Sequence, residues 1–404
     1  MFDKTVNRKG TRSEKWSEEN IKNLTGVSYA EPFWVADMDF YPPLCVTDEM
    51  EKMLSSPSFG YSAFPRLEKA ISSWLEKKHS WCVDEGDITV TSGVLFSLAL
   101  STLLFTKKGD KGMVFFPCYH PFIPLLENAG RTVLPFALGY KDGEFYLEKD
   151  KFMREIKNAD FLVLCSPHNP SGIVFSSSEL EFILTECKKN GVKVFSDEIH
   201  ADLAHPGAHH YPANLINEKI GAECVTIMAP SKTFNIAGEH FSFIIFSSPE
   251  MKEKYRRAQE VLHLSAPSFF SASLSERLYT DALEYNESLC RYLKGNYDAL
   301  CAFVDENMKG IKVVKSSSSF IILIDFSSVY ERIRKEVEDN PLSFPPAPGG
   351  GILSRFFGVR ASVAMNDGTW FGSEYKTFVR INYATSREKL IAALKRMKDA
   401  LESL

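Results

Sequence analysis

The middle of the chain alternates between short apolar runs and segments whose apolar residues recur at helical spacing. Residues 161–165 (Phe-Leu-Val-Leu-Cys) form an unbroken apolar run of the kind expected for a buried parallel strand. Ser176 and Glu179 then have the spacing of a helix capping box, and the helical pattern that follows stops at Gly191. The next apolar run covers residues 192–196. The pattern predicts a strand, a crossover helix and a second strand, which together form a βαβ unit.

Other segments extend this picture toward both ends of the chain. Residues 224–228 predict a further strand, which ends shortly before Lys232. Residues 67–75 predict an amphipathic helix, and Ser386 is predicted to cap a C-terminal helix with an apolar stripe. Residues 340–351 are rich in proline and glycine, which predicts a loop that we interpret as a solvent-exposed insertion.

Alternating strands and helices predict an α/β protein whose large domain contains a mainly parallel sheet covered by helices. We expect this domain to span residues 45–305. Residues 1–44 and 306–404 are expected to pack together as a smaller domain.

Composition and charge narrow the possible locations and partners. The 404 residues carry a net charge of −5, without a dense basic run, so nucleic acid is not an expected partner. The longest nearly apolar run, residues 93–105, is too short and too rich in Ser and Thr to span a bilayer. The first 20 residues lack the apolar core of a signal peptide, so we expect a cytoplasmic protein with no membrane partner. The eight cysteines form no Cys-x-x-Cys pair and are expected to be mostly buried free thiols.

Polar clusters follow three of the predicted strands. They cover residues 166–172 (Ser-Pro-His-Asn-Pro-Ser-Gly), 196–202 (Ser-Asp-Glu-Ile-His-Ala-Asp) and 229–235 (Ala-Pro-Ser-Lys-Thr-Phe-Asn). Because the carboxyl ends of strands in an open parallel sheet line the ligand crevice, we expect these clusters to converge on one ligand. They would offer it an amide, a carboxylate with a histidine, and a lysine.

Together with several other segments, these clusters resemble a known enzyme family. The further segments are residues 34–40 (Trp-Val-Ala-Asp-Met-Asp-Phe), 59–61 (Phe-Gly-Tyr), 91–94 (Thr-Ser-Gly-Val), 117–122 (Pro-Cys-Tyr-His-Pro-Phe) and 378–384 (Phe-Val-Arg-Ile-Asn-Tyr-Ala). In this order, over most of the chain, they resemble the fold-type I pyridoxal-phosphate (PLP) enzymes of the class I/II aminotransferase superfamily. Within it the chain looks most like the MalY/PatB-like cystathionine β-lyase (C–S lyase) branch. The resemblance implies an aspartate aminotransferase-like fold, with a three-layer α/β/α large domain and a smaller α+β domain.

The resemblance also implies roles around the cofactor ring. Lys232 would bind the PLP aldehyde covalently and later remove the substrate's Cα proton. Asp197 would keep the pyridine nitrogen protonated, Asn169 would donate to the phenolic oxygen, and Tyr119 would stack on the ring. Considered singly, the alternatives are a surface lysine, a helix N-cap or surface acid, an Asn-Pro turn and a core tyrosine.

A second group of residues is implied at the cofactor phosphate. The backbone of Ser92, Gly93 and Val94 precedes an apolar helix and would suit an anion, although these residues could also form a simple turn. Ser231 could add a hydroxyl group. Tyr61 matches a residue that reaches the phosphate in the neighbouring subunit, which implies a homodimer with shared active sites.

Substrate contacts follow from the same resemblance. Arg380 would grip the α-carboxylate of an amino-acid substrate, and Ala36 would donate a backbone N–H to the same group, with Tyr119 nearby. A strand-edge salt bridge is the alternative for Arg380. His200 occupies a position where aminotransferases of this fold usually have tyrosine and the C–S lyase branch has histidine. Three other histidines, His205, His209 and His210, are interpreted as loop residues, and no metal site is expected.

The chain departs from the family at three positions around the lysine. Ala229 replaces a serine that is frequent in the branch, and Glu239 replaces a leucine. His240 lies where many fold-type I enzymes have a phosphate-binding arginine. We therefore expect the phosphate contacts to differ from those of the family.

The function that these features favour is a PLP-dependent C–S β-lyase, which cleaves cystathionine or related cysteine S-conjugates to thiol, pyruvate and ammonia. One alternative is a PLP-dependent aminotransferase, because both reactions begin with removal of the same Cα proton. His200 and residues 34–40 favour the lyase. A second alternative is a non-catalytic regulator that retains the fold.

Overall fold

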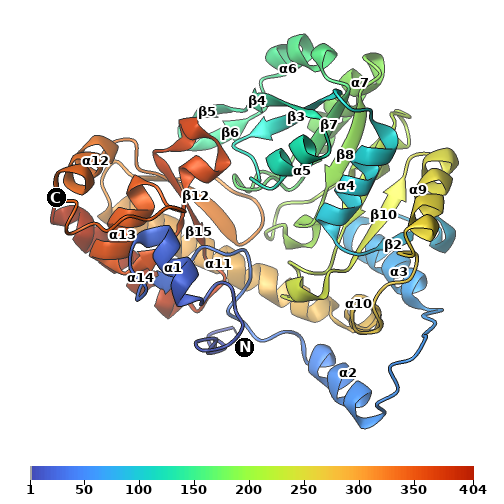
Figure 1. Ribbon diagram of the computed structural model, residues 1–404, viewed down its shortest axis with the longest axis horizontal. Helices are drawn as coiled ribbons and strands as arrows, with labels where there is room; N and C mark the ends of the chain where they lie inside the picture. The colour runs from blue at the N-terminus through green and yellow to red at the C-terminus, as the bar shows by residue number, and fades with distance from the viewer. Residues whose placement is uncertain (1) are drawn as a thin grey trace.

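The computed structural model describes residues 2–404 and centres on a seven-stranded sheet of order β2-β10-β9-β8-β7-β3-β4 (Figure 1). Its strands are β2 (Thr89–Thr91), β3 (Lys111–Phe116), β4 (Thr132–Ala137), β7 (Phe161–Cys165), β8 (Lys193–Asp197), β9 (Cys224–Met228) and β10 (Ser242–Phe246). All neighbours are parallel except β10, which is antiparallel to both β2 and β9. The predicted mainly parallel α/β sheet is confirmed, and the three predicted apolar runs are β7, β8 and β9.

Helices cover this sheet, which explains why β7 and β9 are buried at every position. They include α3 (Leu67–His79), α4 (Val94–Phe105), α5 (Phe122–Asn128), α6 (Lys149–Glu155), α7 (Ser177–Lys189), α8 (Ala213–Asn217), α9 (Pro249–Val261) and α10 (Phe269–Asp281). The predicted capping box is present, because Ser176 Oγ accepts from the Glu179 N–H and Glu179 Oε2 accepts from the Ser176 N–H. Within residues 2–404, no helix has both the length and the apolar character needed to cross a bilayer.

A second, antiparallel sheet of order β11-β12-β15-β14 lies in the C-terminal part. Its strands are β11 (Lys312–Val313), β12 (Ile321–Asp325), β14 (Asn366–Asp367) and β15 (Phe378–Asn382), accompanied by α11 (Leu283–Asn307), α12 (Tyr330–Asp339), α13 (Ile352–Ala361) and α14 (Arg387–Glu402). Ser386 caps α14 as predicted, with its side chain accepting from the Lys389 N–H.

The N-terminal segment lies beside these C-terminal elements. Strand β1 (Glu31–Pro32) pairs in parallel with β13 (Val363–Ala364), and α1 (Glu18–Thr25) contacts α13 (Figure 1). A short hairpin, β5 (Gly139–Lys141) with β6 (Glu144–Tyr146), completes the strands. The domain boundaries expected near residues 45 and 305 stay a prediction.

Helix α2 (Leu44–Ser55) projects from the rest of the molecule (Figure 1). Only Val46 and Met53 of this helix are buried, whereas Leu44 and Leu54 are about three-quarters exposed, at 75% and 70%. The segment after it, residues 56–66, contains Tyr61 with its side chain fully exposed. This part of the chain therefore presents apolar surface that the rest of the chain does not cover.

The proline- and glycine-rich residues 340–351 form a loop, but the interpretation as a solvent-exposed insertion is wrong for part of it. Phe344 is buried, and the Gly349 N–H donates to the backbone oxygen of Asn23 in α1. Trp370 Nε1 donates to Gly349 O at 2.7 Å. The loop packs because its aromatic residue and its backbone polar groups find partners in the N-terminal segment and in α13.

Candidate active site

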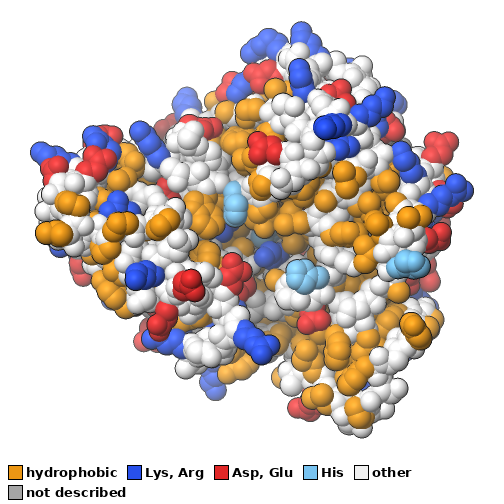
Figure 2. All heavy atoms as spheres, viewed as in Figure 1, with side chains coloured by type: hydrophobic (Ala, Val, Ile, Leu, Met, Phe, Trp, Pro, Cys, Tyr) orange, Lys and Arg blue, Asp and Glu red, His pale blue; other side chains and the backbone are white. Residues whose placement is uncertain are grey.

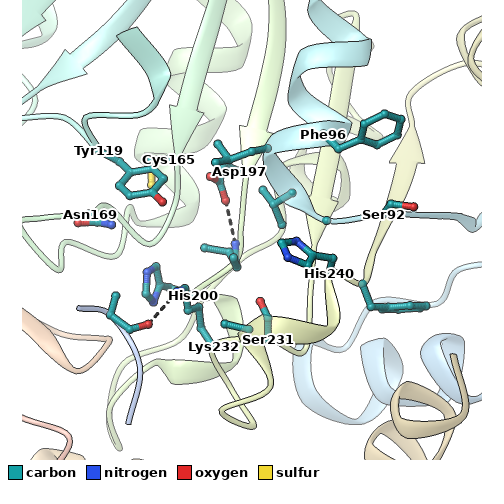
Figure 3. Close-up of a pocket in the computed structure, with 17 residues that line it drawn as sticks. Ser92, Phe96, Tyr119, Cys165, Asn169, Asp197, His200, Ser231, Lys232 and His240 are labelled. Atoms are coloured by element: carbon teal, nitrogen blue, oxygen red, sulfur yellow. Dashed lines mark hydrogen bonds between the residues drawn. The ribbon is translucent and has the colours of Figure 1, made fainter. Parts of the chain in front are cut away.

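The structure contains a cavity of about 320 Å³ at the carboxyl ends of β7, β8 and β9 (Figure 3). This is the edge of the sheet where the sequence places its three polar clusters. Ten of the predicted site residues line it: Ala36, Ser92, Gly93, Val94, Tyr119, Asn169, Asp197, His200, Ser231 and Lys232. Side chains from segments far apart in the sequence therefore share one volume of the size that small-molecule sites have.

Lys232 follows β9 and places its side-chain amine in this cavity (Figure 3). Its Nζ donates to the backbone oxygen of Ala36 at 2.7 Å, and no carboxylate within residues 2–404 forms an ion pair with it. Burial lowers the pKa of the amine from 10.5 to about 8, and this outweighs the opposing effect of Asp37. A substantial fraction of the amine is therefore uncharged, and nucleophilic, slightly above neutral pH.

The backbone around Ala36 is held against the lysine by two asparagines. Asn235 Oδ1 accepts from the Met38 N–H at 2.8 Å, and Asn235 Nδ2 donates to Met38 O at 2.9 Å. Asn382, on β15, donates from Nδ2 to both Val35 O and Asp37 O at 2.6 Å. In the structure, the carbonyl oxygen of Ala36 accepts the hydrogen bond from Lys232. The contact expected between the Ala36 N–H and a substrate carboxylate stays a prediction.

Asp197 is the last residue of β8, directly opposite Cys165 at the end of β7. Its Oδ1 accepts from the Ile199 N–H at 3.1 Å. Burial raises the pKa of this carboxyl from 3.8 to about 7, and Lys232 moderates the rise. A cation placed against Asp197 would bring its pKa down again, so the site favours a protonated nitrogen in a bound ligand.

The residue after Asp197 serves a different set of partners. Glu198 is buried and accepts from His210 Nε2 at 2.8 Å, from Ser196 Oγ and from the Ala213 N–H, both at 2.8 Å. The interpretation of His210 as a simple loop residue is therefore incomplete, because its ring is buried against a carboxylate.

The two neighbouring histidines, His205 and His209, differ in how far their side chains are buried. His205 is buried too, with Nε2 3.1 Å from the Tyr383 hydroxyl, whereas His209 is exposed as expected of a loop residue.

Arg380, on β15, does not line the cavity itself but donates a hydrogen bond to Asn169, which does. Its Nη1 donates to Asn169 Oδ1 at 3.2 Å, and its Nη2 donates to Trp34 O at 3.0 Å and to Asn366 Oδ1 at 2.8 Å. Burial lowers the pKa of the guanidinium from 12.5 to about 10, so it stays charged near neutral pH. The buried Nε has no hydrogen-bond partner within residues 2–404, which leaves one donor of a fixed cation available to an anionic ligand.

Tyr119 and His200 complete this side of the cavity. Burial raises the pKa of Tyr119, with a further contribution from Asp197, so its hydroxyl is neutral. His200 Nδ1 lies 3.1 Å from Ser319 Oγ, and burial lowers the pKa of the ring to about 3, helped by Lys232 and Arg380. His200 is therefore an uncharged imidazole next to two cations.

The other side of the cavity is formed where β2 leads into α4 (Figure 3). Gly93 has a φ of +99° and immediately precedes the helix, whose first turn has no side-chain cap and no acidic residue. The hydroxyl groups of Ser92 and Ser231 belong to the same side. Free N–H groups at a helix start together with hydroxyls suit an anionic group. Figure 2 shows a hollow on this face of the molecule, with basic, histidine and acidic side chains exposed around it.

Two predicted site residues, Arg380 and Tyr61, do not line the cavity. Arg380 contacts the lining residue Asn169. Tyr61 lies in the exposed segment after α2, and its contact with the neighbouring subunit stays a prediction.

Seven residues that line the cavity were not among the predicted site residues: Leu95, Phe96, Cys165, Ile199, Ala237, His240 and Phe241. Cys165 ends β7 and lies beside Tyr119 and Asn169 (Figure 3), so the rule that strand ends carry the site could have found it. Phe96, in the first turn of α4, had no distinctive signal. His240 was noted only as a departure from the family pattern, yet its ring lines the cavity near Ser92 and Ser231.

Comparisons with known proteins agree with this geometry. Residues 38–397 match the family model for aminotransferase class I and II. Cystathionine β-lyase PatB of Bacillus subtilis is 32% identical over 403 residues, covering 99% of both chains.

Two solved structures also superpose along nearly the whole chain. A PLP-bound putative aminotransferase from Clostridium difficile has a TM-score of 0.89 at 30% identity, with 99% of each chain covered. Cystalysin from Treponema denticola, which contains a PLP cofactor, has a TM-score of 0.89 at 26% identity, covering 100% of this chain and 99% of its own. The chain therefore belongs to the class I and II aminotransferase family, in the branch that includes PatB.

Proposed function

We propose that this protein is a PLP-dependent C–S β-lyase that cleaves cystathionine or a related cysteine S-conjugate to a thiol, pyruvate and ammonia. The observation that carries the proposal is a buried amine, Lys232, in a cavity that also holds Asp197 and is flanked by Arg380. An amine, a carboxylate and a fixed guanidinium are the groups that amino-acid chemistry with PLP requires.

The residues present fit this cofactor. Lys232 supplies an amine whose lowered pKa suits covalent attachment to an aldehyde. Asp197 supplies a buried carboxylate for a protonated ring nitrogen, and the uncapped start of α4 supplies N–H groups for a phosphate. When bound, PLP supplies an electron sink for the charge that develops at the substrate's Cα.

Arg380 would bind the α-carboxylate of the substrate. Three oxygen acceptors, on Asn169, Trp34 and Asn366, hold the guanidinium in one orientation. A pre-positioned guanidinium whose Nε has no protein partner within residues 2–404 can donate to a carboxylate and so fixes the angle at which Cα is presented.

Lys232 would act on the Cα proton once its amine is free. In the neutral form, the Nζ lone pair accepts the proton, and the Ala36 carbonyl at 2.7 Å accepts a hydrogen bond from the resulting ammonium. Because its pKa is about 8, the same amine can accept and return a proton at neutral pH with little energetic penalty. The C–S bond then breaks when the electron pair moves from Cα toward Cβ and sulfur leaves as a thiolate.

His200 supports the lyase assignment rather than transamination. Its support is the residue type, because aminotransferases of this fold usually have tyrosine at this position and the C–S lyase branch has histidine; the ring is buried, with Ser319 Oγ 3.1 Å from Nδ1. The relatives that share full-length similarity include proteins named for C–S cleavage as well as a putative aminotransferase. The alternative that remains is therefore an aminotransferase.

We also infer that the protein is a homodimer in which Tyr61 serves the neighbouring subunit. Support comes from the full exposure of Tyr61 and from the exposed apolar residues of the projecting helix α2. A cytoplasmic location is inferred as well, and the eight free cysteines, five of which are buried, are typical of a reducing compartment.

The test is to incubate PLP-loaded protein with L-cystathionine in the absence of any 2-oxo acid and to follow pyruvate and free thiol together. Equal amounts of the two products are expected, with loss of both in Lys232→Ala and normal rates in the exposed-lysine control Lys395→Ala. A visible absorption band of bound PLP without pyruvate or thiol, together with amino transfer once a 2-oxo acid is added, would establish the aminotransferase instead.

A further inference from the structure

His240 lies at the side of the cavity formed by the start of α4. Strand β10 pairs antiparallel with β2, with Ser242 opposite Thr91. Continuing this register by two residues places His240 opposite Gly93. A methyl group on Gly93 would indeed come within 3.8 Å of His240 Cα, so the two backbones run side by side at the helix start.

The backbone conformation at His240 aims its ring into the cavity. A short 3₁₀ helix, η4 (Ala237–Glu239), ends at His240, which has a φ of +47°. The next residue, Phe241, is buried in the core. The left-handed region is uncommon for residues other than glycine, although histidine and asparagine tolerate it better than most. Both residues line the cavity, Phe241 as a buried side chain and His240 with its imidazole near Ser92 and Ser231 (Figure 3).

The chemistry of this wall suits a dianion. Free N–H groups of the α4 start and the hydroxyls of Ser92 and Ser231 are neutral donors. Among the described residues that line the cavity, the basic side chains are those of His200, Lys232 and His240. His200 is held neutral by burial, and Lys232 is the amine that would be bound covalently. His240 is thus the remaining basic side chain of the cavity lining whose ring N–H can donate a hydrogen bond to a phosphate.

We propose that the imidazole of His240 binds the phosphate group of PLP, together with the N–H groups at the start of α4 and the hydroxyls of Ser92 and Ser231. The inference rests on the proposed PLP-dependent function and assigns a specific cofactor contact to a residue that departs from the family pattern. Its role is to hold the cofactor, with no part in the proton transfers at Cα.

The experiment compares PLP with pyridoxal, which has the same ring and aldehyde but no phosphate. Dissociation constants of both for the full-length apoprotein are measured by absorption titration, so the readout is independent of turnover. His240→Asn is chosen because asparagine also tolerates the left-handed backbone but is too short to replace the imidazole. PLP should bind at least about tenfold more weakly to this variant, whereas pyridoxal should change less than about twofold.

Two further variants complete the design. His240→Arg retains a nitrogen donor at this position and should retain at least half of the preference for PLP over pyridoxal. His263→Asn alters another exposed histidine with a positive φ, 53°, outside the cavity, and should change neither constant. An equal loss for PLP and pyridoxal in His240→Asn, or no loss for either, would overturn the assignment. Failure of the wild-type protein to bind PLP through Lys232 would instead refute the proposed function itself, so the two failures are distinguishable.

Discussion

The side-chain amine of Lys232 donates a 2.7 Å hydrogen bond to the backbone oxygen of Ala36, a residue 196 positions earlier in the chain. The bond joins the end of a strand in the large sheet to the N-terminal segment that lies along β15. It has two consequences. The amine keeps a fixed position without a carboxylate partner, and its pKa is governed by burial rather than by an ion pair.

The first prediction concerns the pH dependence of cofactor attachment. The neutral amine reacts with an aldehyde, and burial lowers the pKa of Lys232 to about 8, so the neutral fraction falls as the pH drops below that value. The rate of PLP attachment to the apoprotein should rise with pH and level off above a midpoint near 8. Stopped-flow absorption measures it. Asp37→Asn should move the midpoint to lower pH, because Asp37 raises the pKa. A midpoint near the ordinary 10.5 would show that the amine is not buried in solution.

The second prediction concerns Arg380. Lysine cannot reproduce the planar contacts with Asn169 and Asn366, so Arg380→Lys should lower kcat/KM for L-cystathionine by roughly 10²-fold, mainly through a higher KM. Steady-state kinetics provide the measurement. Arg396→Lys, at a half-exposed arginine paired with Glu31, is the matched control and should have little effect. An unchanged KM in Arg380→Lys would remove Arg380 from the substrate site.

The third prediction separates cofactor binding from cofactor activation. Asp197→Asn keeps the acceptor for the Ile199 N–H but loses the charge. PLP should still bind covalently, while turnover falls on the order of 10²-fold, as when one pre-positioned electrostatic group is removed. The absorption band of bound PLP and single-turnover kinetics report the two effects separately. Loss of the band in this variant would mean that Asp197 is needed for binding rather than for activation.

The fourth prediction tests whether two subunits share each site. Tyr61→Ala and Lys232→Ala should each be nearly inactive as pure dimers. After unfolding and refolding as an equal mixture, half of the dimers would contain one intact site, which restores about a quarter of the wild-type activity. No recovery is expected if Tyr61 acts within its own chain. Tyr29→Ala, at another exposed tyrosine, should be active by itself.

The fifth prediction concerns stability rather than catalysis. His79 Nε2 contacts Asp202 Oδ1 at 2.8 Å, and both side chains are buried. Burial by itself raises the pKa of Asp202, but the hydrogen bond and charge of His79 outweigh it, so the pKa is lowered. The carboxylate therefore contributes stability above its unfolded pKa and loses it as the pH falls through the lower folded value.

Removing the partner of this buried carboxylate should be costly. His79→Ala is expected to reduce the free energy of unfolding by about 3–5 kcal/mol at pH 7, measured by urea denaturation. The control His209→Ala, at an exposed histidine, should change the free energy of unfolding by less than about 0.5 kcal/mol. A small effect of His79→Ala would show that Asp202 finds water or another partner when the ring is absent.

The sequence by itself determined the local elements and most of the site's composition. Apolar runs and capping residues correctly predicted β7, α7, β8 and β9, because these signals act over a few neighbouring residues. Polar residues that follow parallel strands meet at one edge of a sheet, so their positions in the chain were enough to assign Asn169, Asp197 and Lys232 to one cavity.

Only the tertiary structure decided which distant segments meet. Three contacts join segments that are far apart in the sequence and that no local pattern links. They are the hydrogen bond from Lys232 to the Ala36 carbonyl, the hydrogen bond from Arg380 to Asn366, and the approach of His240 to Gly93. Such contacts depend on the order of strands in the two sheets and on how the N-terminal segment packs between them. Local propensities carry no information about that order, because it is set by the joint burial of many side chains across the whole chain.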